Sequence, residues 1–247
     1  MVRFALALAV APAILTAQNL HDPALAAYRR AVVALESHKS GASVEQVFER
    51  GLHVRDLLLR GDPHGTTLVE ALSSTEYDSL KRQLSGFVIG RDEAVFANPD
   101  PEYFIDLARQ FGDAGDRAFF DAYRKTRPSG VWPVWLQPQE DASVCTRFGE
   151  GDLVGTYRLW ADFRQGYPRK YRGEVDEFLV ALEDEVSGAT CACGDPGSVL
   201  KELEAFDRAY PQARVGDNVR RRIRELREDR SPIRFGCTSG PAVHVVR

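Results

Sequence analysis

At residues 128–145 the chain reads PSGVWPVWLQPQEDASVC, and this stretch separates two series of helical patterns. It contains two of the three tryptophans, Trp132 and Trp135, together with three prolines. Proline lacks a backbone N–H donor and restricts the residue before it, so a long helix is excluded here. The stretch ends at Cys145, the first of four cysteines. We expect an extended aromatic strap, residues 128–145, that lies between two helical layers and is tethered covalently.

Apolar residues recur at helical spacing on both sides of the strap. Start signals accompany them: Asp22 before Pro23 is suited to cap a helix, and Ser73 with Glu76 forms a capping box. Glycines such as Gly61 are suited to end helices. The segments expected to be helical are 22–40, 43–61, 73–86, 100–112, 113–127, 153–163, 168–188, 195–211 and 219–226.

These segments predict an all-α protein, an irregular bundle of about nine helices with at most two short strands. Residues 87–98 break the helical pattern, and we expect a buried loop or a short strand with a charged kink there. The kink, Arg91-Asp92-Glu93, is either a solvated turn or a partly buried ion network. No repeat of about 30–45 residues is evident, which argues against a regular solenoid.

The chain begins with MVRFALALAVAPAILTAQ, which has the features of a secretory signal peptide. Arg3 lies in the positively charged start, residues 4–15 are apolar without interruption, and Thr16-Ala17 offers small residues for cleavage. Such an apolar run is shorter than the roughly 20 residues that a spanning helix needs. We expect no transmembrane segment after its removal and an extracytoplasmic protein, periplasmic or secreted. The alternative is a buried first helix of a cytosolic protein.

Three regions follow from these patterns. Residues 1–17 are the expected signal peptide, residues 18–127 an N-terminal helical half, and residues 128–247 the strap with a disulfide-linked helical half. No low-complexity linker separates the two halves, so we expect one compact unit. Arginines outnumber lysines by 27 to 5, which we interpret as the mark of a GC-rich bacterial genome.

The four cysteines, Cys145, Cys191, Cys193 and Cys237, predict two disulfides in an exported chain. A bond between Cys191 and Cys193 would close a strained ring around one residue, so we expect each to bond with the strap or the tail. Of the two remaining patterns we prefer Cys145–Cys191 with Cys193–Cys237. The crossed alternative is Cys145–Cys193 with Cys191–Cys237.

The charge pattern argues against nucleic acid as a partner, because the net charge is −4. Six arginines of the last helical segment alternate with acidic residues, and we expect a solvated face with the pairs Arg221–Glu225 and Arg224–Glu228. The five histidines are scattered, and disulfides explain the cysteines better than metal ligation does. We therefore predict no metal site and no cofactor.

No serine-nucleophile elbow and no glycine-rich phosphate loop occurs in the sequence. A pair of carboxylates beside sugar-stacking aromatic rings is the one catalytic arrangement left open. Carboxylates and rings suited to it are Asp92, Glu93, Glu140, Asp141, Glu150, Trp132, Trp135, Tyr167 and Tyr171. Our candidate ligand-binding residues are Glu93, Asp141, Trp132 and Trp135.

Two hypotheses of function follow. The first is an exported, non-catalytic helical protein that binds or scaffolds a protein or glycan partner in the cell envelope or outside it. The second is a two-carboxylate hydrolase acting on a glycan or cell-wall polymer. A deep cleft lined by carboxylates and by Trp132 or Trp135 would favour the hydrolase, whereas burial of these tryptophans in the core would remove its main support. Trp160, on an apolar helical face, is expected in the core.

Overall fold

The computed structural model describes residues 22–92, 94–139 and 143–237. These residues form ten helices and four short strands, so the predicted all-α class is confirmed. The predicted signal peptide, residues 1–17, lies outside the described residues. The helices are α1 (Pro23–Glu36), α2 (Val44–Leu58), α3 (Leu68–Ala71), α4 (Ser74–Gln83), α5 (Pro101–Phe111), α6 (Ala114–Thr126), α7 (Asp152–Gly166), α8 (Arg172–Gly188), α9 (Pro196–Ala209) and α10 (Gly216–Arg227). The strands are β1 (Phe87–Gly90), β2 (Phe96–Pro99), β3 (Leu136–Pro138) and β4 (Val144–Thr146).

Seven of the ten described helices begin at a side-chain cap, whereas α7, α8 and α10 do not. Asp22 accepts a hydrogen bond from the N–H of Ala24 at 2.7 Å and caps α1, while Ser73 and Glu76 form the expected capping box of α4. The unpredicted tenth helix is the single turn α3. The prediction that a helix starts at Pro168 was wrong, because Tyr171 adopts a φ of +49° and α8 begins after it.

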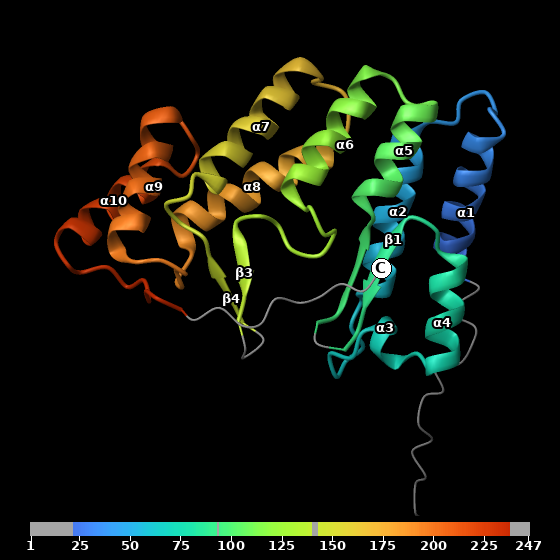
Figure 1. Cartoon of the computed structure of the whole chain (residues 1–247), viewed down its shortest axis with the longest axis horizontal. Helices are drawn as coiled ribbons and strands as arrows, with labels where there is room; N and C mark the ends of the chain where they lie inside the picture. Colours follow the sequence, from blue (N-terminus) through green and yellow to red (C-terminus); the bar gives the residue numbers. More distant parts are fainter. Residues whose placement is uncertain (1–21, 93, 140–142, 238–247) are drawn as a thin grey trace, which may run out of the picture.

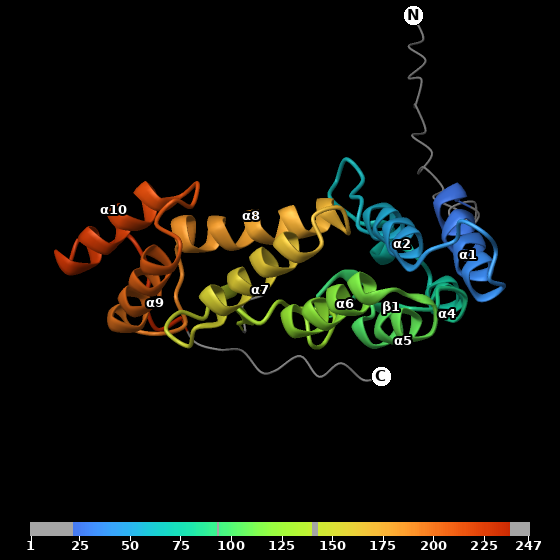
Figure 2. The ribbon, with the colours of Figure 1, turned by 90° about the horizontal axis from the view of Figure 1, so that it is seen from above.

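Four helix pairs, α1–α2, α5–α6, α7–α8 and α9–α10, follow one another along an elongated molecule (Figure 1). Neighbouring pairs contact each other through α2 with α5, α6 with α7, and α7 with α9. Seen from above, α1 and α10 lie at opposite ends of this row (Figure 2). In the part of the chain that the structure describes, every helix falls short of the length and apolarity that crossing a bilayer requires.

Two antiparallel hairpins complete the described structure. Strands β1 and β2 pair with Phe87 opposite Pro99, and β3 and β4 pair with Leu136 opposite Thr146. The expectation of at most two strands was therefore wrong. The segment expected to be a loop or one short strand is a hairpin, with β1 and β2 paired and Arg91 and Asp92 directly after β1. Asp92 is exposed there, while Glu93 lies outside the described residues.

A continuous aromatic core joins the first and second halves of the chain. Phe48 of α2 contacts Tyr171 with ring centroids 5.8 Å apart, and Phe119 of α6 stacks on the same tyrosine at 3.7 Å. Trp160 is fully buried, as expected, and its ring stacks on Phe178 at 4.6 Å. Aromatic pairs in such arrangements contribute beyond the burial of their area.

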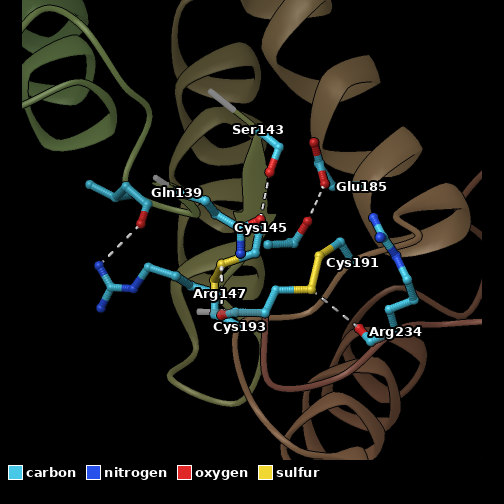
Figure 3. The surroundings of a disulfide bond; sticks show 11 residues. Gln139, Ser143, Cys145, Arg147, Glu185, Cys191, Cys193 and Arg234 are labelled. Carbon is cyan, nitrogen blue, oxygen red and sulfur yellow. Dashed lines mark hydrogen bonds between the residues drawn. A yellow bond between two sulfur atoms is a disulfide. The ribbon is translucent and has the colours of Figure 1, made fainter. Parts of the chain in front are cut away.

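Two disulfides are present, which is typical of proteins in oxidising compartments. They join Cys145 to Cys193 and Cys191 to Cys237, so our preferred pairing was wrong and the crossed alternative is correct. Figure 3 shows Cys145, Cys191 and Cys193 meeting at one junction beside α8. The two bonds tie the strap and the tail to the connection between α8 and α9.

Backbone geometry explains this pairing. The N–H of Thr146 donates to the carbonyl of Cys191 at 3.0 Å, and the N–H of Cys193 donates back to Thr146 at 3.0 Å. This register leaves the Cα atoms of Cys145 and Cys193 5.2 Å apart, within the normal disulfide range. Gly236 has a φ of +64°, so the tail turns there and brings Cys237 to Cys191.

Candidate functional site

Of the four predicted ligand-binding residues, the structure describes only the two tryptophans. Trp135 is only 3% exposed and belongs to the core. Trp132 is partly buried, and its indole N–H is buried with no hydrogen-bond partner among the described residues. Glu93 and Asp141 lie outside the described residues. Burial of Trp135 removes part of the support for a sugar-stacking cleft.

The other residues considered for sugar binding are also dispersed. Glu150 is exposed and forms an ion pair with Arg147, while Tyr171 is buried among aromatic rings. Tyr167 packs on Phe163, with ring centroids 5.2 Å apart. Glu140 lies outside the described residues. Those of these positions that the structure describes do not form the paired carboxylates and open rings that the hydrolase hypothesis needs.

A cavity of about 620 Å³ lies between α1 and α2, and we call it the α1–α2 groove. The two helices pack on each other through a buried face that includes Leu25 and Tyr28 of α1. Beside that face, α1 contributes small side chains one helical turn apart, which leave space next to α2. The groove is lined by Pro23, Ala24, Ala27, Arg30 and Ala31 of α1 and by Gln46, Arg50 and His53 of α2.

The lining of this groove is basic. Arg30 and Arg50 are exposed, and neither forms an ion pair or hydrogen bond with another described residue. No carboxylate is among the lining residues. The next arginine of α2 differs, because Arg55 is paired with Asp56 at 3.0 Å. Two arginines without a carboxylate partner among the described residues therefore line one cavity, in a chain whose net charge is negative.

Buried carboxylates elsewhere have structural partners. Glu202 of α9 is 2% exposed and accepts backbone N–H bonds from Gly149, Gly151 and Val154 at 3.0, 2.8 and 3.1 Å. The cap residue of α7, Gly151, has no side chain, so this carboxylate from another helix satisfies the free N–H groups. Glu202 is thereby fully engaged and is not available as a catalytic group.

A second buried carboxylate links the two halves of the chain. Asp116 of α6 accepts hydrogen bonds from the Lys170 ammonium at 2.9 Å and from the Tyr171 hydroxyl at 2.8 Å. Lys170 also contacts Asp113 at 3.0 Å, and the N–H of Tyr171 donates to Glu45 of α2. Burial, followed by the neighbouring Asp116 charge, raises the pKa of Tyr171, so its hydroxyl stays a donor.

Glu183 of α8 is the third such group. The hydroxyl of Tyr157 donates to it at 3.0 Å, and Arg214 forms an ion pair with it at 2.8 Å. Burial, and secondarily the carboxylate of Glu183, raises the pKa of Tyr157 to about 12. The group thus ties α7 and the α9–α10 connection to α8.

Glu174, in the first turn of α8, is the exception. No hydrogen bond or ion pair with another described residue reaches its carboxyl group. Burial raises its pKa to about 7, against the opposing charges of Arg55 and Arg127. Two further carboxylates, Glu177 and Asp56, act in the same direction as burial. A carboxyl group that titrates near neutrality is a feature of general acids and also of buried structural sites.

This shift has a definite sign for stability. Because the pKa of Glu174 is higher in the folded state, the folded chain binds more protons than the unfolded chain between about pH 4.5 and 7. The stability contributed by the protonated group is fully present below the unfolded pKa. It is lost as the pH rises through the folded pKa.

Sequence reasoning missed the α1–α2 groove. Its signal was present as alanines at 24, 27 and 31 on one side and Gln46, Arg50 and His53 at helical spacing on the other. Among the described residues no group of three or more His, Cys, Asp or Glu side chains is arranged to hold a metal ion. Compared with known proteins, the chain matches no protein-family model and no solved structure.

Proposed function

We propose that this chain is an exported, non-catalytic binding protein whose α1–α2 groove holds an acidic segment of a partner protein. The observation that carries the proposal is the pair of unbalanced guanidinium groups, Arg30 and Arg50, facing one cavity. Like charges that share a cavity repel each other, and a carboxylate bound between them relieves that repulsion. Arginine is also the side chain best suited to grip a carboxylate through two parallel hydrogen bonds.

The dimensions and floor of the groove favour a polypeptide segment. Its volume of about 620 Å³ falls within the range of sites that enclose ligands of a few residues. The floor is apolar and shallow because it is formed by Ala24, Ala27 and Ala31. Gln46 supplies an amide that can donate to or accept from a peptide backbone. An acidic segment with small apolar side chains between its carboxylates would match both the floor and the rim.

Export is part of the proposal, and two features support it. Residues 1–17 have the pattern of a signal peptide, and the four cysteines of the chain are joined in two disulfides. We accordingly place the protein in the periplasm or outside the cell. Amino-terminal sequencing of protein from the native host should give a start near Gln18. Recovery of intact Met1 or Val2 would contradict export by this signal.

The binding proposal is tested with protein that begins at Gln18 and a fluorescent oligoglutamate peptide, using an oligoglutamine peptide as the neutral probe. We expect saturable binding of the acidic peptide that weakens as salt is raised, because screening shortens the reach of the arginine charges. Arg30→Glu with Arg50→Glu should reduce affinity at least about tenfold, equivalent to about 1.4 kcal/mol.

A matched control is available in Arg60 and Arg82. Both are exposed, and neither forms an ion pair among the described residues. Arg60→Glu with Arg82→Glu changes the net charge equally and should leave affinity within about twofold. Equal losses of affinity in both double variants would mean that only the total charge matters, and would contradict binding in the groove. Circular dichroism of each variant confirms that the fold is retained.

A second candidate function, the two-carboxylate hydrolase, is favoured by one observation, the pKa of Glu174 near 7. A protonated carboxyl group is what glycoside cleavage requires of its acid. Incubation of the protein with peptidoglycan and soluble glycans tests it. Release of sugar that Glu174→Gln abolishes would establish the hydrolase and overturn the non-catalytic assignment.

A further inference from the structure

The end of the molecule opposite the α1–α2 groove also carries a basic cavity. This cavity, about 340 Å³ in volume, lies between α9 and α10, and we call it the α9–α10 cavity. Figures 1 and 2 place these helices at the far end of the row from α1. Four of its lining residues are arginines, Arg208, Arg220, Arg224 and Arg227.

Two acidic residues in the lining offset part of this charge. Glu204 forms ion pairs with Arg227 at 2.7 Å and with Arg208 at 3.7 Å. Asp207 pairs with Arg220 at 2.8 Å. One carboxylate is therefore shared by two arginines, and the lining holds more positive than negative groups.

The positive charge left without a carboxylate partner in the lining is that of Arg224. The sequence led us to expect an Arg224–Glu228 pair, but Glu228 pairs with Arg230 instead. Among the described residues Arg224 forms no ion pair. It lies between Arg220 and Arg227 on one face of α10, since residues four and three positions apart are neighbours on a helix. The expected Arg221–Glu225 pair is present at 2.9 Å, and neither residue lines the cavity.

The apolar residues of α10 lie on the face next to this arginine cluster and pack against the rest of the molecule. Val219, Ile223 and Leu226 are buried, and Ile223 also lines the cavity. Arg222 is buried as well and donates to the carbonyls of Val186 and Ala189 at the end of α8. These contacts fix α10, so the arginine face is presented by a helix anchored on both sides rather than by a mobile tail.

We infer that the α9–α10 cavity is a second binding site for an acidic polypeptide segment, anchored by Arg224. Arginines of the lining already form ion pairs with carboxylates, namely those of Glu204 and Asp207. A carboxylate from a partner would balance the remaining positive charge by pairing with Arg224 and with Arg227, which shares Glu204 with Arg208. A nucleic acid fits less well, since these acidic residues and the net charge of −4 would repel a continuous line of phosphates.

Sites at both ends would let one molecule hold two acidic segments at once. A row of helix pairs with a binding site at each end is suited to bridge partner molecules. Linked segments of one partner would then bind more tightly than separate ones, because the second contact becomes intramolecular.

The inference is tested by titrating the full mature chain with the oligoglutamate peptide and measuring stoichiometry by calorimetry. We expect two sites on the parent, and one site on Arg224→Glu. The substitution keeps the fold, because a glutamate here pairs with Arg220, Arg221 and Arg227. Arg169→Glu, a change at an exposed arginine without an ion pair among the described residues, should leave two sites.

The outcomes separate this inference from the function proposed above. Loss of one site in Arg224→Glu supports the inference, and survival of that Arg224-dependent site in Arg30→Glu/Arg50→Glu supports it even if the groove does not bind. Two unchanged sites in Arg224→Glu would overturn it. So would a single site in the parent that Arg224→Glu leaves intact, or light scattering that shows a dimer of this chain which Arg224→Glu dissociates.

Discussion

Trp160→Ala tests whether the aromatic core between the two halves carries the stability of the fold. The indole ring is fully buried, stacks on Phe178 with planes 8° apart, and contacts Phe119 at a centroid distance of 5.4 Å. Its N–H donates to the hydroxyl of Thr126 at 2.9 Å. The substitution removes the ring contacts and leaves the Thr126 hydroxyl without its donor.

The magnitude follows from these contacts. A buried tryptophan removes about 150–250 Å² from water, worth about 4–6 kcal/mol at about 25 cal/mol per Å² as an upper bound. Measured losses for deleting large buried aromatic side chains are about 3–5 kcal/mol. We expect Trp160→Ala to lower the free energy of unfolding by about 4 kcal/mol.

Urea unfolding followed by circular dichroism measures this loss, with Trp132→Ala as the matched control. Trp132 is only partly buried and its N–H has no partner among the described residues. We expect its removal to cost about 1–2 kcal/mol. A loss below about 1 kcal/mol for Trp160→Ala, or equal losses for both variants, would refute the assigned core.

Three further predictions concern stability. Glu202→Gln should cost about 2–3 kcal/mol in urea melts, because an amide presents donors to the N–H groups that cap α7; an unchanged midpoint would contradict this role. Glu174→Gln should make the protein more stable at about pH 8, by roughly 1–3 kcal/mol, and leave stability unchanged near pH 4.5. Glu49→Gln, a change at an exposed carboxylate that does not act on the pKa of Glu174, is its control, and a uniform effect of Glu174→Gln at both pH values would rule out the assigned pKa. Cys145→Ser with Cys193→Ser should cost up to about 4 kcal/mol, and non-reducing peptide mapping of the parent should recover Cys145–Cys193.

Helix positions were largely predictable because they depend on local signals. Aspartate and serine caps, prolines in first turns and apolar periodicity act within one or two turns, so they can be read without knowledge of the fold. The start of α8 was not, since Tyr171 is held in the left-handed region by stacking on Phe119 and by bonds to Glu45 and Asp116. Those partners come from other helices, and no local pattern encodes them.

The disulfide pairing failed for a related reason. The preferred pairing and the crossed alternative both satisfied the spacing of the cysteines. Which of the two forms depends on the register of Thr146 against Ala192 and on the turn at Gly236. Arg222 was expected on a solvated face, yet it caps α8 from inside the protein; burial lowers its pKa to about 10. Helical spacing identifies the face on which a residue lies, but not which neighbouring helix covers that face.

The candidate site was harder to predict than the fold. Tryptophans and loop carboxylates are often functional, yet Trp135 is core and Glu93 and Asp141 lie outside the described residues. A groove is a property of two helices together. The space between α1 and α2 arises because alanines of one helix face longer side chains of the other, which the sequence of neither helix reveals alone.

The central claim, that the α1–α2 groove receives an acidic segment, is tested most directly by a nuclear magnetic resonance titration of the labelled protein with the oligoglutamate peptide. The guanidinium signals of Arg30 and Arg50 and the ring signals of His53 should shift in a saturable way. Those of Arg60 and Arg82, outside the groove, should not. Shifts at Arg60 and Arg82 as large as those at Arg30 and Arg50, or no shift at Arg30 and Arg50 at saturating peptide, would contradict the account.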